Sequence, residues 1–595
     1  MSPNTPDRPD HLMSRRAFLR QSVSLGAAAL AGSTLLAACW PFGDDDDNDE
    51  EATPTPVVDL QPTPEPTPEP EPTPTPVLTP TPEPSPTPIQ PPDEPQPGGR
   101  LTIALPADPL SLHPRADELV TNWTVMSQIY DALMEVDHQF EPVPVLADDF
   151  EIAEDGSAYT FTIPSDVFFH NGDLLTADDV AYTHQWMSSP ENGGARSFYY
   201  ERVESVEAVD DVTVVFTMSG PDGTFLRRAA STFIVNADYH EEFGWERQSL
   251  EPIGTGPFLL DSWDRGDLLT LFRFDDYFDG PAYLDEIQFR VIDQASNRRS
   301  ALENGSVDAV WDLPLSDDLD LEEDNGVQSF QVTNLDCAHI ALNNNHSALS
   351  DRNVRLAMQY AIDRSELVDV IYQGQAVEAT SHLSPALFYW HQDILESGRQ
   401  LTERAIELLE EAGWVEGAGG VRERNGERLS FTCIAPDGQD PRAAGAEAVA
   451  GMLANIGVEM DVQTAPISET LGDMRAGELD AAIFNWTYGG WMGEPDGRTT
   501  LLTGAFNNFS QFSSIQIDNV LYQGVAAIDP EERRTIYRGL QERVVDLSPF
   551  LLLAYPYDWY HAGNRVQGLP DGVRWDSRVL RKLSRCWVFD PDQGE

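Results

Sequence analysis

The clearest alternation of apolar and polar side chains in this chain follows a tight turn near residue 155. Asp155-Gly156 is a turn pair, because glycine accepts the positive φ of a hairpin turn without steric cost. Beyond it, large apolar residues at 159, 161 and 163 alternate with threonines at 160 and 162. Side chains on a strand point to opposite faces in turn, so this pattern predicts a strand with one buried face.

A capped helix is expected after this strand. Asn171-Gly172 forms a second turn, and Thr176 then precedes an acidic pair. The Thr176 hydroxyl can therefore cap a helix whose first turn carries negative charge, which the helix macrodipole favours. Val180, His184 and Met187 recur at helical spacing. The stretch predicts hairpin, turn and helix, and by itself it indicates no chemistry.

The same kinds of pattern continue to about residue 570. We expect strands at 100–105, 338–343, 479–486 and 549–557, and a hairpin at 203–218. We expect helices at 351–364, 402–413 and 448–456, the last two ending at Gly413 and Gly457. Strands that alternate with helices are typical of α/β lobes.

The N-terminus has the pattern of an export and anchoring signal. Ser14-Arg15-Arg16-Ala17-Phe18-Leu19 resembles the twin-arginine motif, and an apolar run follows at 23–38. The run is short of the roughly 20 residues that span a bilayer and ends in Leu36-Ala37-Ala38-Cys39, which resembles a lipobox. We expect cleavage before Cys39 and lipidation of its thiol. The alternative is an uncleaved anchor helix.

Residues 40–99 have the composition of a spacer. They contain an acidic run at 44–47 and repeats of Thr-Pro and Glu-Pro, with few apolar side chains to bury. Such a segment is expected to be disordered or polyproline-like, with a reach on the order of 150 Å. It would let a globular part stand away from the membrane and still meet a membrane partner.

Composition excludes several classes of function. The formal net charge is −63, so the chain cannot bind nucleic acid through a basic surface. Cys337, Cys433 and Cys586 are far apart without a C-x-x-C pair, so no metal site is expected, and a disulfide among them stays open. No H-E-x-x-H, G-x-S-x-G or P-loop motif is present, so we expect no cofactor and no catalytic site.

One loop combines several aromatic side chains with several glycines. Trp486, Tyr488 and Trp491 lie among glycines within 486–496. A loop of this composition can be a buried loop core. It can also form one wall of a ligand site, because aromatic faces contact ligands and glycines permit close approach.

Several segments, in order, resemble the family 5 extracellular solute-binding proteins. The resemblance covers about 100–570, and no single segment is specific, whereas the ordered set is. The segments are Tyr130-Asp131-Ala132-Leu133, Phe169-His170-Asn171-Gly172-Asp173, 175–182, Gly254-Thr255-Gly256-Pro257-Phe258, 301–308, 351–364 and Arg565-Val566-Gln567-Gly568.

The resemblance implies a fold and a domain plan. It implies an α/β, two-lobed periplasmic-binding-protein type II fold with a hinge and an extra subdomain in the first lobe. The expected parts are a signal at 1–39, a linker at 40–99, a first lobe at 100–333 with a subdomain at about 146–250, a second lobe at 334–560, and a return to the first lobe at 561–595.

The resemblance also implies a function and site residues. An extracytoplasmic, lipid-anchored monomer would capture a peptide or similar small polar solute and deliver it to an ABC permease. In similar receptors an aspartate three residues after the tryptophan binds the ligand's ammonium group; here that position is Gly489. The expected ligand residues are Trp486, Tyr488, Gly489, Trp491, Glu494 and Asp496, with Leu112, His113 and Asn343.

Two other classes of function stay open. A secreted hydrolase with a carboxylate pair would turn over its substrate, whereas a receptor returns its ligand unchanged. A surface adhesin on a proline-rich stalk would have a flat binding face and no closure driven by a ligand.

Overall fold

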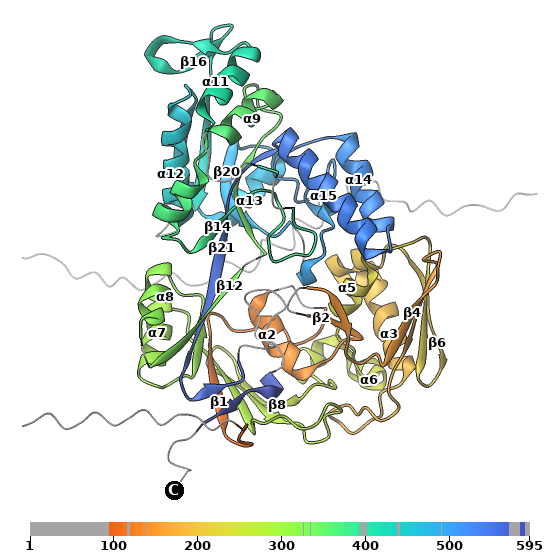
Figure 1. The fold of residues 1–595 in the computed structure, drawn as a ribbon. Coiled ribbons are helices and arrows are strands. Elements are labelled where there is room, and N and C mark those ends of the chain that lie inside the picture. Colours follow the sequence, from red (N-terminus) through yellow and green to blue (C-terminus); the bar gives the residue numbers. More distant parts are fainter. Residues whose placement is uncertain are drawn as a thin grey trace, which may run out of the picture. The chain divides into compact units, whose positions relative to one another are not determined.

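One long strand, β21 (Phe550–Gly563), runs through both halves of the main sheet (Figure 1). Its first part pairs with β13 (Cys337–Leu342) and β14 (Ala376–Glu378), and its second part with β11 (Ala309–Trp311) and β12 (Val327–Thr333). We call the elements on the β11 side the first lobe and those on the β13 side the second lobe. Because both lobes share β21, we call it the hinge strand, and its role as a hinge stays a prediction.

The computed structural model describes residues 94–115, 119–137, 140–324, 326–333, 335–391, 394–395, 401–436, 441–488, 491–569 and 583–589. The chain divides into two units, Met1–Pro86 and Thr87–Glu595, and every described residue lies in the second. The expected signal at 1–39 and nearly all of the expected linker therefore lie outside the described residues.

The first lobe is a mixed sheet with helices. Strand β1 pairs in parallel with β10 and β11, while β8, β9 and β10 run antiparallel to one another. Besides β11 and β12, the first lobe contains β1 (Arg100–Leu105), β8 (Phe258–Asp264), β9 (Leu268–Arg273), β10 (Glu286–Val291), α2 (Val120–Ile129), α7 (Ala295–Glu303) and α8 (Leu315–Glu322).

The second lobe continues the sheet in the order β21, β13, β20, β18, β19. Strands β18, β19 and β20 are parallel, as expected where helices connect them. The elements are β18 (Ser430–Pro436), β19 (Glu459–Ala465), β20 (Ala481–Trp486), α9 (Arg352–Ala361), α11 (Thr402–Glu411), α12 (Pro441–Ala454), α13 (Ile467–Ala476), α14 (Ile515–Ala526) and α15 (Pro530–Leu547).

A separate four-stranded sheet lies within the first part of the chain. Its strand order is β4, β5, β7, β6, and α3 packs against β6 and β7. Helix α3 starts with a capping box between Thr176 and Asp179, as its sequence predicts. We call β4–β7 with α3 and α5 the subdomain: β4 (Asp149–Ile152), β5 (Ala158–Thr162), β6 (Val203–Asp210), β7 (Thr213–Met218), α3 (Ala177–Ser188) and α5 (Phe225–Ala230).

Two elements differ from the sequence expectation. Helix α12 begins at Pro441, whereas the sequence pattern predicted a start near Ala448. The first turns were missed because they are rich in alanine and glycine and show no apolar periodicity. Strand β21 continues past Tyr557 to Gly563, because its second part finds partners in β11 and β12. The expected lobe boundaries stay predictions.

The open question of a disulfide is resolved for the described residues. Cys337, Cys433 and Cys586 are all buried and free. Burial raises the pKa of Cys433 and of Cys586 to about 12, so both thiols are protonated at neutral pH. Buried, protonated thiols behave as small apolar side chains.

Candidate functional site

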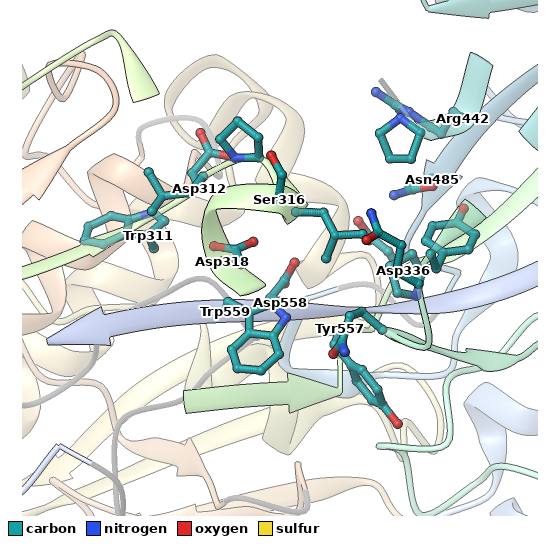
Figure 2. A pocket seen from close by; sticks show the side chains of 18 of the residues that line it. Trp311, Asp312, Ser316, Asp318, Asp336, Arg442, Asn485, Tyr557, Asp558 and Trp559 are labelled. Carbon is teal, nitrogen blue, oxygen red and sulfur yellow. The ribbon is translucent and has the colours of Figure 1, made fainter. Parts of the chain in front are cut away.

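A cavity of about 820 Å³ lies where β21 passes between the lobes (Figure 2). Its volume is in the range of small-molecule sites, and both lobes and the hinge strand line it. The lining residues are Pro106, Val120, Trp311, Asp312, Leu313, Pro314, Leu315, Ser316, Asp318, Asp336, Ile371, Tyr372, Gln373, Gln375, Pro441, Arg442, Asn485, Pro556, Tyr557, Asp558 and Trp559.

The first lobe contributes a turn between a strand and a helix. Strand β11 ends at Trp311, and Asp312 follows in the left-handed region with φ of 59°. An aspartate tolerates this conformation better than most residues. The chain then enters α8 after Pro314, which places Asp318 in the first turn of that helix. Figure 2 shows Trp311, Asp312, Ser316 and Asp318 on this side of the cavity.

Asp318 is held in place by the hinge strand. Its Oδ1 atom lies 3.0 Å from Nε2 of His561 on β21, and Nδ1 of His561 lies 2.8 Å from the Ser329 hydroxyl on β12. Burial raises the pKa of the Asp318 carboxyl, and His561 partly offsets this effect. The contact joins α8 to the part of β21 that follows the cavity.

The second lobe contributes a helix start and a strand end. Arg442 lies in the first turn of α12, and Asn485 is the penultimate residue of β20. A short π-helical segment, Leu367–Ile371, precedes Tyr372. Single π-helical turns are frequent at functional sites. Figure 2 shows Arg442 and Asn485 at the opposite end of the cavity from Trp311 and Asp312.

A second cavity of about 790 Å³ is chemically plainer. It lies between the turn that joins β4 to β5 and the connection from α14 to α15. Its lining has no aromatic or basic side chain and consists of aliphatic residues, proline, glutamine and carboxylates. The first cavity has convergent aromatic, amide, acidic and basic groups, so we take it as the candidate site.

The comparisons with known proteins agree with this architecture. The family model described as "bacterial extracellular solute-binding proteins, family 5 Middle" matches residues 141–510. This protein belongs to that family. The oligopeptide-binding protein AppA of Bacillus subtilis (strain 168) is 27% identical over 509 residues, 83% of this chain and 92% of AppA.

One further relative and one solved structure are similar to this family 5 protein. Heme-binding protein A of Haemophilus influenzae is 27% identical over 492 residues, 77% of this chain and 88% of the relative. The structure of AppA from Bacillus subtilis in complex with a nonapeptide matches with a TM-score of 0.69 at 25% identity. The match covers 84% of this chain and 100% of the AppA chain. The mixed α/β, two-lobed fold expected from the sequence is thus confirmed.

In this family 5 protein, the aromatic side chains expected to bind ligand pack against the protein itself. Tyr488 is 5% exposed; its hydroxyl lies 2.9 Å from Nε2 of His339, and its ring stacks on Phe550 at 4.9 Å. Trp486 is half-buried, with its ring centroid 4.9 Å from that of Phe509. Both rings therefore have structural contacts.

The two carboxylates in the expected ligand set are paired with arginines. Glu494 lies 2.6 Å from Arg533 and 3.9 Å from Arg227. Asp496 lies 3.3 Å from Arg228 on α5. The structure does bring Glu494 and Asp496 together around a small cavity of about 80 Å³, which is also lined by Arg227 and Arg228. Their charges are balanced inside the protein.

The other expected residues are also buried. Leu112 is part of the main core, and His113 packs against His240 with ring centroids 5.1 Å apart. Burial lowers the pKa of His113, so its ring is neutral at pH 7. The Asn343 amide donates a hydrogen bond of 2.9 Å to the carbonyl of Leu479.

None of these expected residues with described side chains lines the 820 Å³ cavity. Gly489, the side chain of Trp491, and Cys39 lie outside the described residues, so the ligand roles of the set stay predictions. Sequence reasoning missed the lining around Trp311 and Trp559. A usable signal was present: Tyr557-Asp558-Trp559 follows a proline and mixes aromatic with acidic groups, as 486–496 does.

The described residues include neither a metal-binding cluster nor a membrane-spanning helix. No group of three or more histidine, cysteine, aspartate or glutamate side chains in that part of the chain could hold a metal ion. Within the same residues, no helix is long and apolar enough to cross a membrane.

Proposed function

We propose that this protein is the solute receptor of an ABC importer and that it holds its solute in the cavity beside β21. The observation that carries the proposal is the lining of that cavity, which comes from both lobes and from the strand that joins them. A solute there contacts both lobes only when they are close together. This differential contact is what shifts a two-state equilibrium toward the closed form.

The solute is a peptide or another small polar molecule. The cavity mixes carboxylates, an arginine, amides and aromatic rings, which suits a ligand with both polar and apolar groups. Among the relatives, one is named for oligopeptides and another for haem. Specificity in such a fold depends on a few side chains of the site, so we take the ligand class from the cavity.

Export and anchoring complete the proposal. The twin-arginine motif and Cys39 support translocation, cleavage and lipidation, and the proline-rich segment at 40–99 supports a tether. The receptor acts as a monomer outside the cytoplasm and passes its solute to a membrane permease. No bond is made or broken in the solute.

The test is ligand capture by the purified, full-length mature protein. Native mass spectrometry would identify a co-purified solute, and thermal shift would then compare peptides, haem and nickel chelates. Binding at a hundredfold excess over Kd stabilises by about 2.7 kcal/mol, which such an assay detects readily. We expect a stabilising solute that is recovered chemically unchanged. Turnover of the solute would identify an enzyme, and no stabilisation by any class would contradict the receptor.

A further inference from the structure

Three ion pairs cross the interface at which the subdomain packs against the second lobe. Two of their arginines belong to α5 of the subdomain, and the third lies in the segment that precedes α14 of the second lobe (Figure 1). All three arginine side chains are buried, with 4–6% of their surface exposed. We call these pairs the latch: Arg227 with Glu494 at 3.9 Å, Arg228 with Asp496 at 3.3 Å, and Arg498 with Glu201.

The charged groups of the latch also have partners on their own side of the interface. The subdomain side includes the turn before β3 (Pro142–Pro144), a strand that packs against α5. The own-side distances are 2.6–3.1 Å, shorter than the two distances given for the latch. The own-side pairs are Arg227 with Glu141, Arg228 with Asp222, Arg498 with Asp496, and Arg533 with Glu494.

Because of these own-side pairs, the interface can open without leaving a buried charge unpaired. Removing one partner of a buried ion pair is strongly destabilising, since the other charge then has no compensation. Here each arginine of the latch keeps a carboxylate when the two sides separate. Glu201 is 33% exposed already, so water can hydrate its carboxylate in the open form. The arrangement suits an interface that opens and closes repeatedly.

The closed arrangement is held by groups of the protein itself. Besides the latch, the backbone N–H of Gly223 donates a hydrogen bond of 2.8 Å to the carbonyl oxygen of Val525. Gly493 lies so close to Phe140 that a Cβ atom added to the glycine would be 2.5 Å from that of Phe140. These contacts form whether or not a solute is bound, so they favour the closed form by themselves.

We propose that the subdomain and the second lobe close on one another without a solute, and that the latch holds them in this resting state. The open form is then a minor state whose population is set by the latch. This inference concerns the protein before any solute binds and goes beyond the proposed function. In the receptor proposed above, the latch would determine how often the protein is open to a solute.

The experiment is hydrogen exchange, followed by mass spectrometry, on the mature protein after dialysis, with native mass spectrometry to check that no solute remains. The reporter is the amide of Gly223, because its hydrogen bond crosses the interface. Glu201→Gln removes the charge of one latch pair and leaves Arg498 paired with Asp496. We expect it to speed exchange at Gly223 about three- to tenfold. Exchange of the β5 amides should stay unchanged, because the subdomain stays folded.

Two further variants are the controls. Glu204→Gln removes the same charge at an exposed position on β6 and should leave exchange at Gly223 unchanged. Glu141→Gln weakens an own-side pair. Opening would then leave Arg227 poorly compensated, so exchange at Gly223 should be unchanged or slower.

Four outcomes would overturn the inference. Exchange at Gly223 in the unaltered protein as fast as in an unprotected peptide would show that the resting state is open. No acceleration in Glu201→Gln would show that the latch does not hold the interface. Equal acceleration in Glu204→Gln would assign the effect to the charge of the whole protein. Parallel acceleration of the β5 amides would indicate unfolding of the subdomain. None of these results bears on the proposed function, which is tested by solute capture.

Discussion

The backbone N–H of Gly223, beside the subdomain helix α5, donates a hydrogen bond of 2.8 Å to the carbonyl oxygen of Val525 on α14 of the second lobe. The approach is so close that a Cβ atom on Gly223 would overlap with the carbonyl oxygen of Ala527. Gly156, in the turn between β4 and β5, would likewise meet Ile528. The subdomain and the second lobe are therefore joined through backbone that has no room for side chains.

This contact predicts that Gly223→Ala loosens the packing of the subdomain against the second lobe. The added methyl group must push the two segments apart, and overpacking of this kind costs about 1–3 kcal/mol. The measurements are urea unfolding and the radius of gyration from small-angle scattering, which should increase. Gly451→Ala is the control, because Gly451 lies in α12 with nothing within 4 Å of the added atom. Gly451→Ala should raise the free energy of unfolding by about 0.4–1 kcal/mol.

The buried ion pair between Arg533 and Glu494 gives a second prediction. Their side chains are 2% and 10% exposed, and the atoms are 2.6 Å apart. Arg533→Met leaves a buried carboxylate poorly compensated, which should cost about 3–5 kcal/mol in the free energy of unfolding. Arg247→Met, at an exposed pair with Glu251, should leave the free energy of unfolding nearly unchanged, because solvent screens an exposed pair. Equal losses in the two variants would contradict this assignment.

His382 predicts a specific acid sensitivity. Neither ring nitrogen has a hydrogen-bond partner among the described residues, and burial lowers its pKa to about 3. The unfolded chain, with an imidazole pKa near 6.5, then takes up the proton first. The stability that neutral His382 contributes is complete above about pH 6.5 and is lost progressively as the pH falls toward 3.

We therefore expect His382→Phe to reduce the loss of stability between pH 6.5 and 5.0 by about 2 kcal/mol. The measurement is urea unfolding at several pH values. The slope of the free energy of unfolding against pH decides the result. Leu250→Ala is the control, because Leu250 is exposed and neither side chain can bind a proton, so the slope should be unchanged. An unchanged slope in His382→Phe would show that His382 takes up no extra proton on unfolding.

Neighbouring residues on β20 separate two interpretations of the segment 486–496. Asn485 lines the cavity, whereas the next side chain, Trp486, packs on Phe509. Asn485→Ala should weaken binding of the solute about two- to tenfold, the worth of one hydrogen bond, and leave stability nearly unchanged. Trp486→Ala should lower the free energy of unfolding by about 2 kcal/mol. The opposite pattern would support the ligand wall that the sequence predicts at Trp486.

Elements that depend on near neighbours were predictable. The alternation over 159–163 and the Thr176 cap correspond to β5 and α3, and the stripe at Ala405, Leu408 and Leu409 is buried on α11. In each case the side chains that decide the structure lie within a few positions of one another. The start of α12 was not predictable in this way, since alanine and glycine do not mark a buried face.

The ordered set of segments in the sequence identified the family, and that resemblance implied the two-lobed fold. The single strands and helices followed from capping, turn chemistry and periodicity, because these act over short stretches. Only the tertiary structure decided where the cavity lies. Its lining comes from segments as far apart as Pro106, Trp311, Arg442 and Trp559. The loop at 486–496 has a composition that suits a ligand wall and a buried core equally well. The contact of Tyr488 with His339 is made across the fold, so composition could not predict it.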